Sequence, residues 1–429
     1  MEPDSFSFTE LLHFGGFDYA GQKHYVVVVD RAGSKVLSME FDNNAEGWRK
    51  FLDRLCAFPK IAFTIETCCG ADVERLLEAG LPVFPINPKA AQRYRERKSV
   101  AGCKSDELDA FCMADALRTD GSAWRRLTPM DPLTHELRVL CRDEIHLIEM
   151  RTASINHLKA TLHDYYPAAL EAFDDWVSPG AWDFVITFPT PAELVSAGKR
   201  KWQKFLFSHH MAGQNKLDAR MAVFARAADF GNPVPAVIAA KSLLAKQLRL
   251  LEGQLCIYRS RITALFRQHP DHACFGSLPG AGEKLAPRLL AELGSCREVF
   301  ATAESLQAYA GTAPVTKKSG KSHIVHFRRA CNCYLRATVH LWVDLSRSYC
   351  VWADTYYQQK RKQGMGHAAA LRCLGQRWLN ILWRMWKNNT AYDEAKHLKN
   401  QVKHGSWVVR MLPEQKPLPE NVNKLAQKN

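Results

Sequence analysis

GFDYAGQKHYVVVVD, residues 16–30, predicts two strands joined by a tight turn. Gly16–Ala20 forms the first predicted strand, Gly21–Lys23 the turn, and the β-branched run His24–Asp30 the second strand. Asp18 stands inside the first strand between two aromatic residues, where a carboxylate is costly unless it is paired or metal-bound. The stretch therefore predicts a β-hairpin that carries a functional acid.

Predicted strands and helices alternate from this hairpin to about residue 120. The remaining elements are strands at Gly33–Met39, Lys60–Glu66 and Pro82–Ile86, and helices at Ala45–Phe58, Ala71–Ala79 and Ser105–Arg118. The order β-β-β-α-β-α-β-α is the one found in ribonuclease-H-like (RuvC-like) folds. Residues 1–125 therefore predict an α/β domain of that class.

The rest of the chain predicts further units. Residues 130–270 hold two long helical stretches, the second with apolar residues alternately four and three positions apart, typical of a coiled coil but also of an ordinary core stripe. Residues 167–235, rich in Trp, Pro and Gly, predict an inserted, partly helical lobe. Residues 271–412 predict a mostly α-helical C-terminal domain, and the polar residues 413–429 a disordered tail.

Charge and hydropathy limit the classes of function and partner that the chain can have. Lys and Arg total 58 against 44 Asp and Glu, so the net charge is +14, which suits a polyanion such as nucleic acid. A merely basic enzyme is the alternative. No apolar run reaches the roughly 18 residues of a membrane span, and the N-terminus lacks the pattern of a secretion signal. We therefore expect a cytoplasmic protein with no membrane partner.

Asp18, Glu66, Asp106 and Asp109 stand where a ribonuclease-H-like arrangement brings elements together. Asp106 and Asp109, three positions apart, share one face of a predicted helix. Carboxylates packed together repel one another, and two divalent cations would neutralise them while clamping the oxygens of a phosphoryl transfer. Oxygen ligands favour Mg²⁺ or Mn²⁺. Any one of these acids alone is more often a helix cap or a solvated surface charge, and Asp106 in particular could cap its helix.

Residues 311–322, GTAPVTKKSGKS, resemble a phosphate-binding P-loop but have Val315 where that motif needs glycine, so no ATP site is predicted. What remains is Ser319 beside Gly320 in a basic loop. Gly320 allows the backbone close to a DNA phosphate, and nearby lysines can stabilise its charge. A serine hydroxyl is a poor nucleophile unless it is activated. The lysines are Lys317, Lys318 and Lys321.

A second glycine-rich segment, residues 278–282 (LPGAG), precedes a predicted helix at Lys284–Leu293 and resembles the hairpin of a helix-hairpin-helix element. Gly280 and Gly282 expose backbone N–H groups that suit a phosphate, although a plain turn explains them nearly as well. Other predicted nucleic-acid contacts are Lys104, Lys284, Arg328, Arg329 and Arg336.

Six segments together resemble one family. They are GFDYAGQKH (16–24), IETCCG (65–70), KSDELDA (104–110), LPGAGEKLAPRLLAELG (278–294), FATAESLQAYAGTAPVTKKSG (300–320) and RRACNCYLRATVHLWV (328–343). In this order they resemble the bridge-RNA-guided DEDD insertion-sequence recombinases, which pair a RuvC-like N-terminal domain with a serine-bearing C-terminal transposase domain. KSD stands where KTD is more usual, and its hydroxyl can still cap the helix.

The resemblance implies a bacterial transposase. Asp18, Glu66, Asp106 and Asp109 would bind Mg²⁺, and Ser319 would form a phosphoserine linkage to DNA. Implied partners are donor and target double-stranded DNA, a bridge RNA that pairs with both, and further copies of the chain, from a dimer to a tetramer, held by the coiled coil. Ser322 is a rival nucleophile.

Two other functions stay open at this stage. A metal-dependent RuvC-like nuclease or Holliday-junction resolvase would use the same four acids, hydrolyse DNA with water and ignore Ser319. A non-enzymatic binding protein with a decayed acidic fold gains little from clustered negative charge near DNA, which speaks against it.

Overall fold

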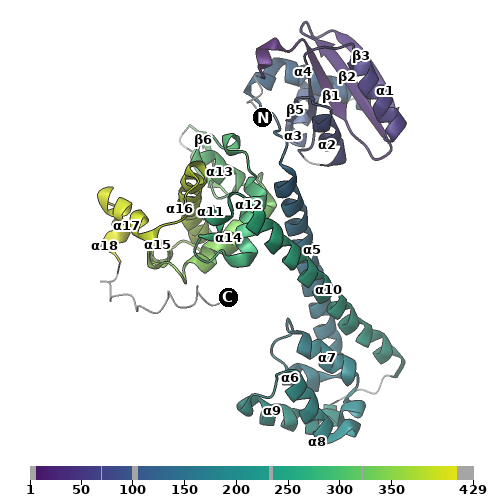
Figure 1. The fold of residues 1–429 in the computed structure, drawn as a ribbon, viewed down its shortest axis with the longest axis vertical. Helices are drawn as coiled ribbons and strands as arrows, with labels where there is room; N and C mark the ends of the chain where they lie inside the picture. Colours follow the sequence, from purple (N-terminus) through teal and green to yellow (C-terminus); the bar gives the residue numbers. More distant parts are fainter. Residues whose placement is uncertain (1–5, 69, 99–104, 231–234, 321, 413–429) are drawn as a thin grey trace. The chain divides into compact units, whose positions relative to one another are not determined.

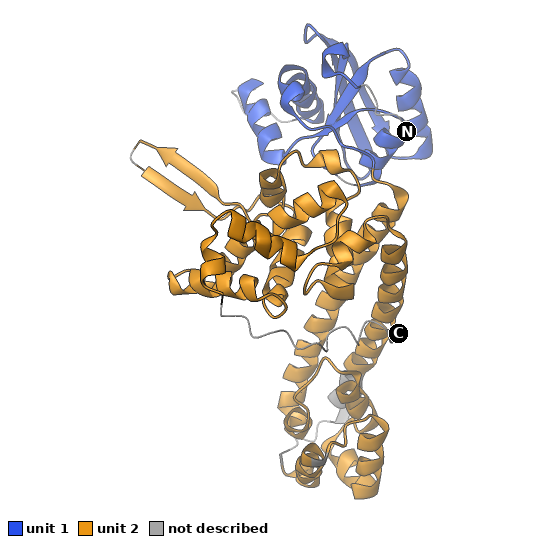
Figure 2. Cartoon of the chain, turned by 60° about the vertical axis from the view of Figure 1, so that its left-hand side comes forward, with its two compact units in different colours: residues 1–129 blue, residues 130–429 orange. Residues whose placement is uncertain are grey.

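The computed structural model describes residues 6–68, 70–98, 105–230, 235–320 and 322–412. The chain divides into two compact units, residues 1–129 and 130–429 (Figure 2). The finer division predicted from the sequence stays a prediction, and its tail, 413–429, lies outside the described residues. Within the described ranges, no helix combines the length and the apolar character that crossing a membrane requires.

Unit 1 is built on a five-stranded sheet of order β3-β2-β1-β4-β5 (Figure 1). Neighbouring strands β1, β2 and β3 pair antiparallel, whereas β4 pairs parallel to β1, and β5 parallel to β4. The strands are β1 (His13–Asp18), β2 (Lys23–Asp30), β3 (Lys35–Asp42), β4 (Ile61–Ile65) and β5 (Val83–Pro85). β1 is therefore central, with a neighbour on each side.

Helices cover both faces of this sheet. Trp48 and Phe51 of α1 (Ala45–Leu55) and Leu76 of α2 (Ala71–Glu78) pack on one face, while Ala114 and Leu117 of α4 (Asp106–Asp120) pack on the other. Successive valines of β2 point alternately to these two cores. Because both faces are buried, the VVVV run is continuous rather than alternating with polar residues.

Gly16 lets β1 cross the backbone of α4 at close range. A Cβ built at Gly16 would lie 1.9 Å from the carbonyl oxygen of Ala110 and 2.7 Å from the backbone nitrogen of Ala114. No side chain fits there without moving the helix or the strand. The contact therefore sets the distance between β1 and α4, which both supply acids to the site described below.

We expect Gly16→Ala to destabilise unit 1 by roughly 1–3 kcal/mol, at the upper end of that range because its new methyl group meets backbone. The measurement is hydrogen exchange of peptides from β1 and α4, where faster exchange is expected. Gly21→Ala is the control, since a Cβ at Gly21 meets nothing within 4 Å. Equal protection in the two variants would contradict this role for Gly16.

The predicted order of elements in unit 1 is confirmed, with shifted ends and one addition. β1 spans His13–Asp18 rather than Gly16–Ala20, so Asp18 is its last residue, not an interior one. Glu66 lies directly after β4 rather than within it. The basic stretch after Asn87 forms a helix, α3 (Pro88–Lys98), which was not predicted. Its start follows a familiar rule, with proline at the first position and the Asn87 side chain accepting from the Lys89 N–H at 2.9 Å.

Unit 2 is organised by two 34-residue helices, α5 (Pro132–Tyr165) and α10 (Pro235–Gln268). They run antiparallel: Leu137 and Ile262 share one core, while Leu158 and Leu248 share another. Both helices were predicted. The apolar residues of α10 that stand alternately four and three positions apart are mostly buried from Leu248 onward, with Tyr258 partly exposed. The pair thus connects two separate cores within unit 2.

Each end of the α5–α10 pair carries helices packed around one of these cores (Figure 1). The lobe predicted at 167–235 is largely helical and has its own aromatic core, including Trp182 and Phe184. The helices at this end are α6 (Pro167–Ala172), α7 (Pro179–Thr187), α8 (Pro191–Ser208) and α9 (Gln214–Ala225). At the other end are α11 (His272–Gly276), α12 (Gly282–Leu293), α13 (Ala303–Tyr309), α14 (Cys333–Ser346), α15 (Val351–Lys362), α16 (His367–Asn388), α17 (Glu394–Lys403) and α18 (Trp407–Arg410).

A β-hairpin of strands β6 (Val315–Ser319) and β7 (Ser322–His326) projects from the helices of unit 2 (Figure 2). A basic loop was predicted here, and that prediction was wrong. β-branched residues such as Val315 and Val325 favour strands, and lysines are common on exposed edge strands. The C-terminal part of the chain is otherwise helical, as predicted.

Candidate functional site

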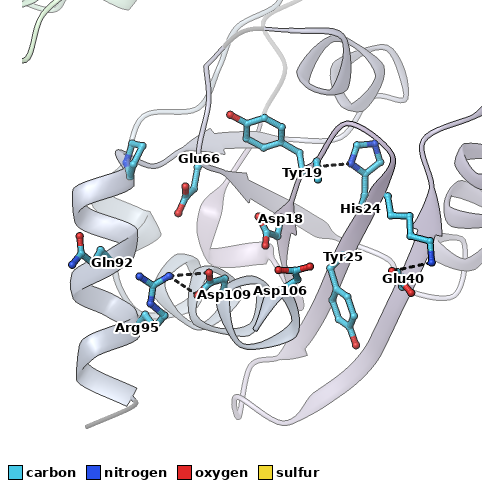
Figure 3. Close-up of a pocket in the computed structure, with 13 residues that line it drawn as sticks. Asp18, Tyr19, His24, Tyr25, Glu40, Glu66, Gln92, Arg95, Asp106 and Asp109 are labelled. Carbon is cyan, nitrogen blue, oxygen red and sulfur yellow. Dashed lines mark hydrogen bonds and ion pairs between the residues drawn. The ribbon is translucent and has the colours of Figure 1, made fainter. Parts of the chain in front are cut away.

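The four acids predicted from the sequence line one pocket of unit 1 (Figure 3). Its volume is about 360 Å³. Asp18 comes from the end of β1, Glu66 from the residue after β4, and Asp106 and Asp109 from the first turn of α4. Because β1 and β4 are adjacent parallel strands, their carboxyl ends meet at one sheet edge. The fold thus gathers acids from widely separated parts of the sequence.

The three acids in the first turn of α4 do not all point into the pocket. Ser105 is the N-cap, and its hydroxyl accepts from the Leu108 N–H at 3.1 Å, so the alternative that Asp106 caps the helix is wrong. Asp106 and Asp109 line the pocket, whereas Glu107 accepts from the Lys35 ammonium at 2.5 Å. This hydrogen bond lowers the pKa of Glu107. Glu107 is therefore a carboxylate of the same turn outside the pocket.

Arg95 of α3 reaches into the same pocket (Figure 3). Its Nη1 lies 2.7 Å from Oδ1 and 2.8 Å from Oδ2 of Asp109. The hydrogen bond to Asp109 raises the pKa of Arg95, and the charge of Glu66 adds to the rise. Arg95 was not predicted from the sequence, since it stands in a stretch rich in Arg and Lys, 93–98, in which no single residue is distinguished. The helical spacing between Gln92 and Arg95, which both line the pocket, was the available signal.

The turn after β1 is fastened by a buried histidine. The Ala20 N–H donates to Nδ1 of His24 at 3.3 Å, and Nε2 of His24 lies 3.4 Å from Oδ1 of Asp72. The His24 ring also packs against the Phe17 ring, with centroids 5.1 Å apart. These contacts restrain the chain on both sides of Asp18, whose side chain lines the pocket.

The donor set of the pocket suits a hard divalent cation. All four predicted ligands offer carboxylate oxygens, the type that Mg²⁺ and Mn²⁺ prefer. Among the described residues, no three His, Cys, Asp or Glu side chains are close enough together to hold a metal ion as they stand. A cation would therefore require the carboxylates to close around it, with Asp109 already engaged by Arg95.

Ser319 belongs to unit 2 and ends strand β6 at the tip of the exposed hairpin. It pairs directly with Ser322, the first residue of β7. Gly320, with φ +53°, begins the loop between them, and Lys321 lies outside the described residues. Directly opposite residues of an antiparallel pair point to the same face, so Ser319, Ser322 and Lys317 share one face. Lys318 lies on the other face.

The other predicted nucleic-acid contacts are spread over unit 2. Gly280 has φ +75°, and a Cβ there would lie 2.8 Å from the backbone nitrogen of Ser346, so packing against α14 already requires glycine. Gly282, with φ +53°, begins α12, where Lys284 is exposed. Arg329 is exposed, while Arg328 donates through Nε to the Ala313 carbonyl at 3.0 Å at the hairpin base. Lys104 lies outside the described residues.

The base of the hairpin carries an aromatic residue that was not predicted. Phe327 is 45% exposed, with the guanidinium groups of Arg336 and Arg372 at 5.4 and 4.9 Å from its ring centroid. Arg372 also lines a small pocket here with Arg328 and His326. Positive charge beside an exposed ring is a combination found in surfaces that bind single-stranded nucleic acid. Arg372 was likewise not predicted, because it lies far from Phe327 in the sequence.

Comparison with known proteins follows the same two-part pattern. Residues 15–167 match a family model described as transposase, and residues 272–358 match one described as transposase, IS116/IS110/IS902 family. A mini-circle protein of Streptomyces coelicolor, named as a transposase for IS117, is 32% identical over 401 residues, which cover 89% of this chain and 96% of that protein. Two uncharacterized insertion-element proteins are also similar. A 43.6 kDa protein of IS110 from Streptomyces coelicolor is 28% identical, and the match covers 89% of this chain and 95% of that protein. A 42 kDa protein of IS900 from Mycobacterium paratuberculosis is 27% identical, and the match covers 89% of this chain and 97% of that protein.

Proposed function

Since this chain belongs to the IS116/IS110/IS902 family of transposases, we propose that it cuts and rejoins DNA through a metal-assisted covalent phosphoserine intermediate. The observation that carries the proposal is the convergence of Asp18, Glu66, Asp106 and Asp109 on one pocket. A pocket lined by carboxylates repels the phosphates of DNA unless cations bind between the carboxylates and the phosphates.

The topology of unit 1 supports a ribonuclease-H-like, RuvC-like assignment. Three antiparallel strands are extended by two parallel ones in the order β3-β2-β1-β4-β5. Acids at the ends of β1 and β4 and on α4 then meet at one sheet edge. Two divalent cations held there would stabilise the charge of a scissile phosphate. Mg²⁺ or Mn²⁺ fits the donor set.

In the proposed reaction, Ser319 Oγ attacks the phosphorus of a DNA phosphodiester. An Oγ–P bond forms, the bond from phosphorus to one deoxyribose oxygen breaks, and that oxygen takes up the proton that the serine gives away. A hydroxyl of another strand then attacks the phosphoserine, which restores the serine and joins the new strands. The ester conserves the free energy of the original bond, so no ATP is needed.

The placement of Ser319 supports this assignment. The hydroxyl stands at the tip of a projecting hairpin, where DNA can reach it, and Lys317 on the same face can contact the phosphate. A left-handed glycine next to it keeps the tip narrow. Ser322 faces the same side and remains the rival nucleophile.

We further propose the partners of the reaction. Donor and target double-stranded DNA would be selected by a bridge RNA through base pairing, while basic residues hold backbone phosphates. The α5–α10 pair would act as a coiled coil that joins copies of the chain into a dimer or tetramer. The setting would be the bacterial cytoplasm.

A recombination assay tests the proposed function. A plasmid with donor and target sites is incubated with the protein, Mg²⁺ and RNA transcribed from the DNA that flanks the reading frame. Donor–target junctions that require all three components are expected, as read by amplification across the junction. Nicked or hydrolysed DNA without junctions would instead indicate a RuvC-like nuclease.

A further inference from the structure

Arg95 brings a positive charge into the pocket that the four acids line. Its guanidinium lies within 2.8 Å of both carboxylate oxygens of Asp109, and the negative charge of Glu66 also acts on it. The pair is well shielded, with 24% of the Arg95 side chain and 11% of the Asp109 side chain exposed. A shielded charge-assisted pair of this kind is stronger than an ordinary surface ion pair.

The guanidinium and a divalent cation compete for the same oxygens. Asp109 directs both oxygens at Nη1 of Arg95, and a cation that uses Asp109 as a ligand must take at least one of them. Arginine does not lose its proton in proteins, so the conflict cannot be relieved by neutralising it. A cation bound to Asp109 would also lie within a few ångströms of the guanidinium, and the repulsion between the two positive charges favours movement of the Arg95 side chain when the cation binds.

Helix α3 can stay in place while this side chain moves. The Tyr94 hydroxyl donates to Oδ2 of Asp120 at 2.6 Å, and the Lys98 ammonium lies 2.8 Å from Oδ2 of Asp115. Both partners are on α4, so α3 is tied to α4 independently of Arg95. Exchange of the Asp109 partner then needs only a change of rotamer in a long, flexible side chain.

We propose that Arg95 is the resident counter-ion of the acidic pocket, which holds Asp109 until a divalent cation replaces it. This inference rests on the proposed metal site. In the structure Asp109 is held by α3 instead of by its fellow acids, so its bond to Arg95 stands between this ligand and a cation. Cation binding and release of Arg95 are one coupled event, so Arg95 lowers the apparent affinity for the cation.

The test measures Mn²⁺ affinity of the full chain by the electron paramagnetic resonance signal of free Mn²⁺. Arg95→Gln is expected to bind Mn²⁺ about tenfold more tightly than the wild-type chain, equivalent to about 1.4 kcal/mol. Arg93→Gln is the control, since it removes the same charge from an exposed position on the same helix. Its affinity should stay within about twofold of wild type because exposed charges are screened. Arg95→Lys, which keeps a cation, should fall between wild type and Arg95→Gln.

A second readout is the melting temperature. Without Mn²⁺, Arg95→Gln should melt below wild type because Asp109 has lost its partner; with saturating Mn²⁺ its melting temperature should rise by more than that of wild type. Equal Mn²⁺ affinity and equal Mn²⁺-induced shifts of the melting temperature in Arg95→Gln and wild type would overturn the proposed role of Arg95 but not the proposed metal site. A wild-type chain that binds no Mn²⁺ would overturn the proposed metal site together with it. If Arg95→Gln does not fold, the same comparison is decided by Arg95→Lys.

Discussion

Ser319→Ala is expected to form no covalent adduct with DNA and to rejoin strands roughly ten-thousandfold more slowly or not at all. The variant lacks the attacking oxygen, and loss of a nucleophile is among the largest single effects in enzymes. The measurement is a denaturing gel of the full chain incubated with end-labelled DNA, where the adduct migrates with the protein. Folding should be unaffected because Ser319 is exposed.

Ser322→Ala is the matched control for this experiment. Ser322 pairs with Ser319 across the hairpin and lies on the same face, so it experiences the same strand geometry. The adduct should persist in Ser322→Ala at near the wild-type amount. An adduct lost in Ser322→Ala and kept in Ser319→Ala would move the nucleophile to β7, and DNA hydrolysis that is equal in both variants would favour water.

Asp18→Asn is expected to slow Mg²⁺-dependent DNA cleavage on the order of a thousandfold, about 4 kcal/mol in the barrier. The change keeps the shape of the side chain but removes a negative charge from the end of the central strand β1, where cations would bind. Single-turnover cleavage at increasing Mg²⁺ concentrations measures both the rate and the Mg²⁺ requirement, which should rise.

Glu107→Gln is the control for the loss of one carboxylate. Glu107 lies one residue from Asp106 but bonds to Lys35 and Ser38 outside the pocket. Its cleavage rate should stay within about threefold of wild type, because surface ion pairs contribute little. Similar losses in Asp18→Asn and Glu107→Gln would mean that the pocket has no special role in the reaction.

The convergence of the four acids could be predicted because strong local patterns placed their elements. The continuous β-branched run of β2 and the apolar run of β4 identify strands buried on both faces, and adjacent parallel strands end at one edge. The cap at Ser105 fixes the start of α4, and with it the direction of Asp106 and Asp109. The exact ends of β1 could not be predicted, since they depend on pairing with β2 and β4.

Arg95 and the hairpin were harder to predict, for different reasons. α3 is predominantly polar, and apart from Ala91 it buries little, so hydrophobic periodicity gives almost no signal for it. It is held by polar contacts such as Tyr94 with Asp120, and burial together with this bond raises the pKa of Tyr94 to about 12. The hairpin strands are almost wholly exposed, so their lysines indicated a loop rather than strands.

The most direct test of the proposed reaction is to identify the residue that carries DNA in the adduct. The full chain is reacted with DNA, Mg²⁺ and the flanking RNA; the adduct is then digested with nuclease and protease and its peptides are sequenced by mass spectrometry. We predict a nucleotide phosphate on Ser319, formed only with Mg²⁺ present and absent from Asp18→Asn. A nucleotide on any other residue, or cut DNA that never becomes attached to protein, would contradict the proposed mechanism.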